Sequence, residues 1–245
     1  MRKSLLAVFF AIAGVFCQNA DEYKIQSLPG IDITTLKFSQ YAGHIELSKK
    51  SNSNIFFWMV EQEEKTDPQK LIIWLNGGPG CSSMDGLFLE NGPFRVKKDL
   101  SLSINKGGWQ KYATNIYVDQ PVGTGYSFAD WDSYMHNMTQ ITEEFVQFMD
   151  KLYEIFPKLR QQDLYIAGES FAGSYIPYFA NRIPQPIIAG HLFCCFTCQA
   201  YICDCDEYPL VWTDCIYYTG LRYTVDLFRF IHVSKGQAGS RQARK

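Results

Sequence analysis

Hydrophobic and polar positions first alternate between Thr35 and Leu47, with Tyr41-Ala42-Gly43 interrupting the pattern. A period of two is typical of strands with one buried face, so this stretch predicts a half-buried antiparallel strand pair. Asn54–Val60 is a compact run of β-branched and aromatic residues and predicts another strand. The charged stretch Glu61–Gln69 contains Pro68 and predicts a turn.

The later strands are apolar without alternation, which is typical of strands buried on both faces. They are Lys70–Leu75, Asn115–Asp119 and Leu164–Ala167. Between the last two, apolar residues recur at helical spacing from Thr139 to Phe156, and Pro157 ends the pattern. Antiparallel strands followed by strand–helix–strand–helix predict an α/β fold, with a mixed sheet and flanking helices.

The N-terminus predicts a secretory signal peptide. Arg2 and Lys3 precede an apolar run, Leu5–Phe16, that is shorter than the roughly 20 residues of a membrane span. A membrane anchor is the disfavoured alternative. The mature chain would then enter an oxidising compartment, where cysteines pair and the sequon at Asn137 becomes a glycosylation site. We expect the secretory pathway, ending in a lysosome or vacuole or outside the cell, and no stable membrane anchor.

The character of the chain changes after Arg182. Ile183-Pro184-Gln185-Pro186 cannot continue a helix, and the following sequence is rich in Cys and Tyr without a clear period. We therefore expect a signal peptide over 1–20, an α/β domain over 21–183 that is truncated after its last helix, and a Cys-rich tail over 184–245 of unknown or no structure. The net charge of 23 − 25 = −2 and the lack of a basic run argue against a nucleic-acid partner.

A serine follows the strand Leu164–Ala167, within the segment Gly168–Gly173, and a helix is expected over Tyr175–Arg182. At a sharp strand-to-helix turn, a serine hydroxyl is exposed above the sheet, and small residues two before and two after let the backbones approach. The helix N-terminus adds partial positive charge where an oxyanion would form. Chance Gly-x-Ser-x-Ala sequences are common, but the flanking strand and helix favour a nucleophile at Ser170.

A Gly-rich turn, Asn76–Ser83, follows the strand Lys70–Leu75. Glycines leave backbone N–H groups uncovered, which suits an oxyanion hole. Taken alone, the turn would be a plain tight loop. Together with the predicted serine elbow it favours acyl transfer by a serine nucleophile.

Four long segments then stand in order along the chain: Trp74–Ser83, Leu87–Phe94, Asn115–Phe128 and Gly168–Pro177. Through them the chain resembles the serine carboxypeptidases over roughly Tyr23 to Ile183. The resemblance implies an α/β-hydrolase fold and removal of C-terminal residues from peptides or proteins in an acidic compartment, without a cofactor or a metal. It also implies that Cys81 pairs with a cysteine from a part of the family's sequence that has no counterpart here, so that its partner is missing or comes from the tail.

The resemblance assigns roles residue by residue. Ser170 resembles the nucleophile, and the backbone N–H groups of Gly78 and Phe171 resemble the oxyanion hole. The residues that match those holding the substrate's terminal carboxylate are Asn76, Gly77, Glu90 and Glu169. Two ionised glutamates would repel that carboxylate, so binding requires a shared proton, which low pH supplies.

The triad partners of the serine have no matching segment in this chain. Asp204, Asp206, Asp214 and Asp226 follow Ser170, as do His191 and His232, but no strand-end context surrounds them. His44 and His136 are interpreted as ordinary surface or turn residues. An alternative hypothesis is therefore a catalytically inactive, truncated secreted glycoprotein that lacks the Asp and His of the triad.

Six cysteines lie between Cys194 and Cys215, and Cys195, Cys198, Cys203 and Cys205 have spacings that imitate zinc ligands. On a secretory route disulfides are favoured over zinc. A third hypothesis is that the tail is unselected sequence, because its onset inside the chain is abrupt.

Overall fold

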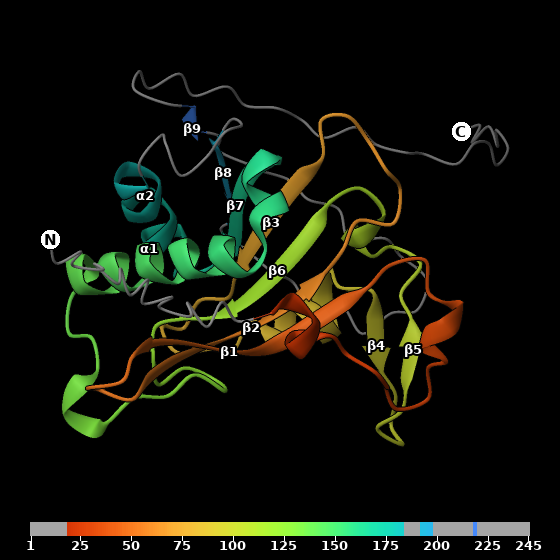
Figure 1. The fold of residues 1–245 in the computed structure, drawn as a ribbon, viewed down its shortest axis with the longest axis horizontal. Helices are drawn as coiled ribbons and strands as arrows, with labels where there is room; N and C mark the ends of the chain where they lie inside the picture. The colour runs from red at the N-terminus through yellow and green to blue at the C-terminus, as the bar shows by residue number, and fades with distance from the viewer. Residues whose placement is uncertain (1–18, 184–191, 198–217, 220–245) are drawn as a thin grey trace, which may run out of the picture.

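A computed structural model describes residues 19–183, 192–197 and 218–219. Its main element is a seven-stranded sheet with the order β1-β2-β6-β3-β7-β8-β9 (Figure 1). The neighbours β1, β2 and β6 pair antiparallel, β6, β3, β7 and β8 run parallel, and β9 is antiparallel to β8. The predicted mixed sheet is confirmed. The strands are β1 (Gln40–Ser48), β2 (Ser53–Val60), β3 (Lys70–Leu75), β6 (Thr114–Asp119), β7 (Asp163–Glu169), β8 (Leu192–Thr197) and β9 (Tyr218–Thr219).

Two longer helices and a small second sheet complete the described part. Helix α1 is Met138–Ile155 and helix α2 is Ala172–Arg182, while β4 (Phe94–Val96) and β5 (Leu102–Ile104) form a two-stranded antiparallel sheet. The short helical turns are Ala20–Tyr23, Ile33–Thr35, Gly86–Glu90, Trp109–Lys111, Trp131–Ser133 and Pro157–Gln161.

The first antiparallel pair differs from the prediction. Tyr41-Ala42-Gly43 does not interrupt a hairpin, because β1 runs straight through it and pairs with β2, with Gly43 opposite Phe57. Gly43 is needed for packing: a Cβ there would lie 2.7 Å from the ring of Tyr23. The prediction of a strand pair within Thr35–Leu47 was therefore wrong. The sequence alone does not distinguish a glycine that allows close packing within a strand from a glycine in a turn.

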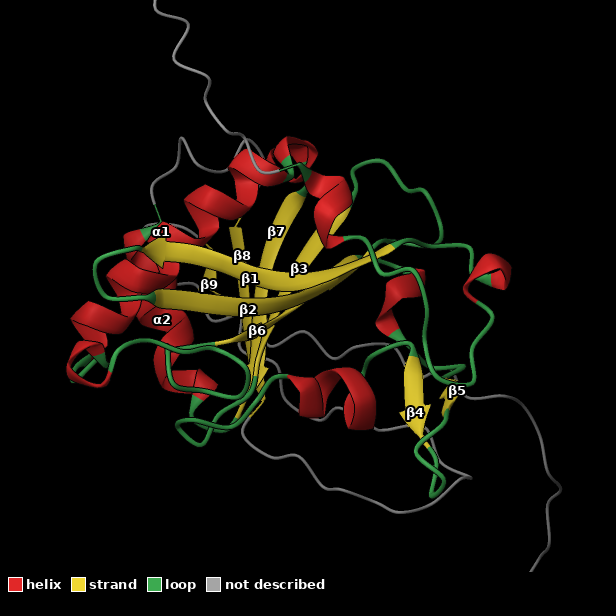
Figure 2. Cartoon of the chain, turned by 60° about the horizontal axis from the view of Figure 1, so that its bottom comes forward, coloured by secondary structure: helices red, strands yellow, loops and turns green. Residues whose placement is uncertain are grey.

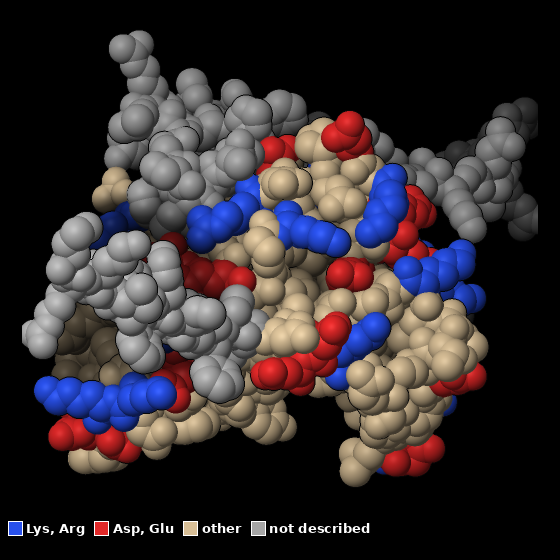
Figure 3. Space-filling model, in the orientation of Figure 1, with Lys and Arg blue, Asp and Glu red and all other residues tan. Residues whose placement is uncertain are grey.

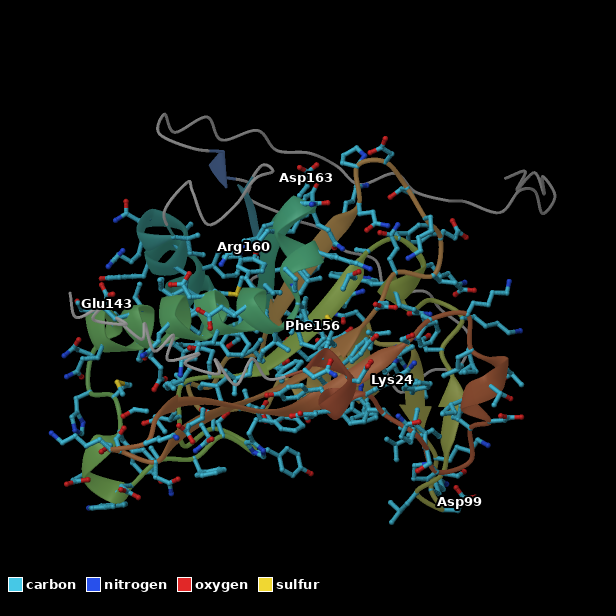
Figure 4. All side chains as sticks on the ribbon, viewed as in Figure 1. Lys24, Asp99, Glu143, Phe156, Arg160 and Asp163 are labelled. Carbon is cyan, nitrogen blue, oxygen red and sulfur yellow. The ribbon has the colours of Figure 1, made fainter. Side chains whose placement is uncertain are left out.

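Helices α1 and α2 cover one face of the sheet (Figures 1 and 2). The rings of Phe145 and Phe179 stack between the helices with centroids 4.1 Å apart, and Arg182 Nε donates to Glu143 Oε1 at 2.6 Å. Figure 4 labels Glu143 on α1, and Phe156 just past the end of that helix, where its ring lies 5.2 Å from that of Tyr41. The helix predicted over Thr139–Phe156 is shifted by one residue, and the expected helix at Tyr175 begins three residues earlier, at Ala172.

A second cluster of buried side chains lies on the opposite face of the sheet. Its members are Val60, Trp74, Met84, Leu87, Tyr117 and Ala167, with Trp109 packed edge-on against Trp74 at 5.5 Å. This cluster places the turn Gly86–Glu90 beneath the end of β3, where the Gly-rich segment begins. The second core therefore supports the segment in which the sequence predicts an oxyanion hole.

The sheet continues past Arg182, where the sequence pattern predicted neither a strand nor a helix. Strand β8 runs parallel to β7, with Leu192 opposite Leu164 and Thr197 opposite Glu169. Such pairing joins positions that are distant in sequence, and local periodicity does not report it. No side chain of β8 or β9 is described.

The surface carries charges of both signs. On the face drawn in Figure 3, acidic and basic side chains are interspersed, in keeping with the small net charge of −2. Within the ranges that the structure describes, no helix is both long enough and apolar enough to cross a membrane. The predicted signal peptide falls almost entirely outside those ranges.

Candidate active site

Ser170 lies at a sharp turn between β7 and α2, at the carboxyl edge of the parallel strands. Its φ of +53° is in the left-handed region, which non-glycine residues rarely adopt. A Cβ on Gly168 would lie 2.3 Å from the carbonyl oxygen of Leu75 and 2.7 Å from Cβ of Ala172. The small residues on both sides of the serine therefore let β7, β3 and α2 meet, as the elbow interpretation requires.

The Ser170 side chain is exposed and, within the described ranges, forms no hydrogen bond. A strained backbone at a functional turn is a recognised way to present a side chain outward. The turn can therefore present the hydroxyl to an approaching carbonyl group without first breaking a hydrogen bond to any of the described residues.

The Gly-rich segment lies directly against this elbow. A Cβ on Gly77 would be 2.5 Å from the backbone nitrogen of Phe171 and 2.9 Å from Cβ of Ser170, so only glycine fits. Gly78 has a φ of +105°, and the N–H of Cys81 donates to the Gly77 carbonyl at 3.1 Å. Neither the Gly78 nor the Phe171 N–H donates to another group in the part of the chain described. Two unused N–H groups therefore remain beside Ser170.

Asn76 joins this turn to two glutamates. Its side chain is buried, and its Nδ2 donates to Glu169 Oε1 at 2.9 Å and to Glu90 Oε1 at 3.4 Å. The indole Nε1 of Trp74 donates to Asn76 Oδ1 at 2.7 Å, which fixes the amide with its nitrogen toward both carboxyls. Gly86 makes room, because a Cβ there would lie 2.2 Å from that indole nitrogen.

The Glu90 carboxyl keeps its proton to a higher pH than an ordinary glutamate. Burial raises its pKa to about 7, the nearby Glu169 charge adds to the rise, and the hydrogen bond from Asn76 opposes it. The Arg95 guanidinium donates to the backbone carbonyls of Glu90 and Phe94, and neither salt bridge between described side chains involves the Glu90 carboxyl. This arrangement allows the pair of carboxyls to carry one proton between them.

Asp119 lies at the same carboxyl edge of the parallel strands as Ser170, and the sequence did not indicate it as a site residue. It is fully buried at the end of β6, and its carboxylate accepts hydrogen bonds from Ser82 Oγ, Ser83 N and Tyr126 N at 2.7–2.9 Å. Burial raises its pKa, although all three hydrogen bonds lower it. Its position at the carboxyl end of a buried strand is the sequence feature that could have indicated a site residue.

The remaining predicted residues divide by location. His44 lies on β1, with Nε2 2.8 Å from the carbonyl oxygen of Tyr126, and His136 is exposed before α1. Asn137 is exposed at the N-cap of α1, where its side chain accepts from the Gln140 N–H at 3.0 Å. Cys81 is exposed and forms no disulfide among the described side chains.

The triad candidates Asp204, Asp206, Asp214, Asp226, His191 and His232 lie outside the described residues, as do Cys198, Cys203, Cys205 and Cys215. Where side chains are described, no group of three or more His, Cys, Asp or Glu residues is placed to hold a metal ion.

Comparison with known sequences assigns these features to a family. The sequence profile of the serine carboxypeptidases matches residues 29–190. This chain belongs to that family. Among its carboxypeptidase relatives, the pheromone-processing carboxypeptidase kex1 of Aspergillus oryzae is 41% identical over 196 residues, covering 78% of this chain and 31% of the relative. The corresponding KEX1 protein of Uncinocarpus reesii is 47% identical over 173 residues, covering 71% and 27%.

A solved structure of the family supports the same assignment. The crystal structure of Kex1(delta)p, a prohormone-processing carboxypeptidase from Saccharomyces cerevisiae, superimposes with a TM-score of 0.62 at 36% identity, covering 66% of this chain and 38% of that one. The α/β-hydrolase fold expected from the resemblance is confirmed. The chain spans only about a third of the length of these serine carboxypeptidases.

Proposed function

We propose that this chain carries the nucleophile and the C-terminal carboxylate site of a serine-type carboxypeptidase, and that it acts on the C-termini of peptides or proteins. The observation that carries the proposal is the Asn76 amide, which faces Glu169 and Glu90 beside the Ser170 elbow. A site that holds the free terminal carboxylate beside Ser170 selects the last peptide bond of a chain, because the carbonyl group of that bond lies one residue before the carboxylate.

In the proposed reaction, Ser170 Oγ attacks the scissile carbonyl carbon and its proton passes to a general base. The developing oxyanion accepts hydrogen bonds from the N–H groups of Gly78 and Phe171. The C–N bond then breaks, the amine takes a proton and leaves as the C-terminal amino acid, and water hydrolyses the acyl-enzyme. No described residue is bonded to the Ser170 hydroxyl, and the candidate Asp and His partners lie outside the described ranges.

The terminal carboxylate is held by the Asn76 amide, the Gly77 backbone and the two glutamates. Because the substrate brings a further negative charge to Glu90 and Glu169, binding requires the proton that Glu90 keeps below a pH of about 7. We therefore expect hydrolysis of free peptides to be favoured at acidic pH.

The same proposal includes the route of the chain through the cell. The predicted signal peptide over residues 1–20 leads to the secretory pathway, with a lysosome, a vacuole or the extracellular space as the destination. Asn137 is exposed, and it caps α1 through its oxygen, which leaves its Nδ2 atom available for a glycan. Both statements agree with an acidic or extracellular working environment.

The direct test is the release of a C-terminal amino acid from an acylated dipeptide by the purified 245-residue chain, with Ser170→Ala as the control. Release by the parent chain at pH 5 and none by Ser170→Ala is the expected result. No release from folded, monodisperse protein would instead favour the alternative of an inactive secreted glycoprotein without its triad partners.

A further inference from the structure

Asp119 connects two loops that meet beside the candidate active site. The first is the Gly-rich turn Asn76–Ser83, and the second is the loop that follows β6, up to Ser127. Oδ1 of Asp119 accepts from Ser82 Oγ at 2.8 Å and from Ser83 N at 2.7 Å, and Oδ2 accepts from Tyr126 N at 2.9 Å. One buried carboxylate thus receives three donors from two loops.

The contacts continue from Asp119 to the carboxylate site. Ser83 Oγ donates to the Val118 carbonyl at 2.7 Å and accepts from the N–H of Asn76 at 3.1 Å. Ser83 is therefore held at both its backbone and its side chain, and Asn76 is held by Ser83. Asn76 in turn begins the turn whose Gly77 contacts the Ser170 elbow.

The Asp119 carboxylate is closely surrounded and forms no salt bridge with the described side chains. The two salt bridges between described side chains, Lys37–Glu63 and Arg182–Glu143, do not involve Asp119, and the nearby Asp85 adds like charge. On the other side, a Cβ at Gly125 would lie 2.1 Å from Asp119 Oδ2. A buried acid without a cation is costly unless its donors hold it, so its retention at this position fits a role in holding those donors.

We propose that Asp119 is a positioning residue for the Gly-rich turn, which sets the Gly78 N–H and the Asn76 amide without contacting substrate. This inference rests on the proposed function, because it deepens the account of the same site. Both carboxylate oxygens of Asp119 accept hydrogen bonds, whereas asparagine has one oxygen that accepts and one NH2 group that only donates. In Asp119→Asn, the NH2 group therefore faces at least one backbone N–H that has lost its acceptor. The turn should then lose its fixed position while the sheet keeps its strands.

The test is amide hydrogen exchange on the full 245-residue chain, comparing the parent with Asp119→Asn and with Ser127→Ala. Ser127→Ala is a matched control, because its hydroxyl bonds the Asp119 carbonyl and the Phe56 N–H but not the Asp119 carboxylate. In Asp119→Asn, amide exchange over residues 76–83 should accelerate about tenfold, because one hydrogen bond to a charged acceptor is lost. The exchange rates of β7 should not change. In Ser127→Ala, residues 76–83 should exchange as in the parent.

Unchanged exchange over residues 76–83, or an equal acceleration over these residues and β7, would overturn the proposal. If Asp119→Asn does not fold, Ser82→Ala removes one of the three donors and should give the same local pattern at smaller amplitude; no local change there overturns it as well. The rate of fluorophosphonate reaction at Ser170 gives an independent result and should fall about 100-fold in Asp119→Asn. A parent chain that does not react at all contradicts the proposed function, whereas the exchange result tests Asp119 separately.

Discussion

Replacement of Glu90 by glutamine tests the shared-proton account of carboxylate recognition. In the parent chain, a carboxyl with a pKa of about 7 is about 99% protonated at pH 5 and about 9% protonated at pH 8. Because a free carboxylate binds only to the protonated site, its affinity should fall about tenfold over this range. Glutamine is neutral at every pH, so Glu90→Gln should bind with nearly the same affinity at pH 5 and pH 8.

The assay is fluorescence anisotropy of a dye-labelled dipeptide, measured in a Ser170→Ala background to prevent turnover. The corresponding dipeptide amide, which has no terminal carboxylate, should show little pH dependence. Glu144→Gln is the matched control, because burial also raises the pKa of Glu144 to about 7 but its carboxylate bonds Val122 N at 3.0 Å, away from the turn and both glutamates. The reasoning is refuted if Glu90→Gln keeps the tenfold loss, or if Glu144→Gln abolishes it.

Three further predictions concern stability and substrate binding. Gly77→Ala places a Cβ 2.5 Å from Phe171 N and should lower the free energy of unfolding by about 1–3 kcal/mol in urea titrations; an unchanged midpoint would contradict the close contact. Trp74→Phe leaves Asn76 Oδ1 without its buried donor and should weaken dipeptide binding about tenfold but amide binding little, so equal losses for both ligands would refute the orienting role. Asn137→Gln and Thr139→Ala should both remove the glycan, as measured by gel mobility after secretion. Only Asn137→Gln should also lower the free energy of unfolding, by about 1 kcal/mol, because it removes the N-cap of α1. A glycan retained in either variant would exclude this site.

The Glu90 proton also predicts how stability depends on pH. Its pKa in the folded chain lies above the ordinary value of 4.5, so protonation favours the folded state. This contribution is complete below a pH of about 4.5 and is lost as the pH rises through about 7. In thermal melts between pH 5 and 8, Glu90→Gln should therefore lose less stability than the parent chain.

The central strands and α1 were predictable because their signals are local. Lys70–Leu75 and Leu164–Ala167 are apolar runs bounded by turn residues, and the spacing of Phe145, Phe148 and Leu152 alone indicates a helix. The turn predicted at Gly43 was wrong, because this glycine makes room for the ring of Tyr23, which is distant in sequence. Strand β8 was missed because its pairing with β7 is not local.

The candidate site was predictable to the extent that its residues belong to segments that resemble the family. Ser170, Asn76 and the glutamates are of this kind. The resemblance did not indicate how Asp119 acts, since its function depends on three donors that meet only in the folded chain. The raised pKa of Glu90 likewise arises from burial, which no short segment encodes by itself.

The most direct measurement is the reaction of the intact chain with a fluorophosphonate, followed by peptide mass spectrometry and repeated with a free dipeptide as competitor. The account predicts an adduct on Ser170 whose formation the dipeptide slows at pH 5 and hardly affects at pH 8, because only the protonated glutamate pair admits its carboxylate. Folded protein that carries no adduct on Ser170, or an adduct that the dipeptide does not slow at either pH, would contradict it.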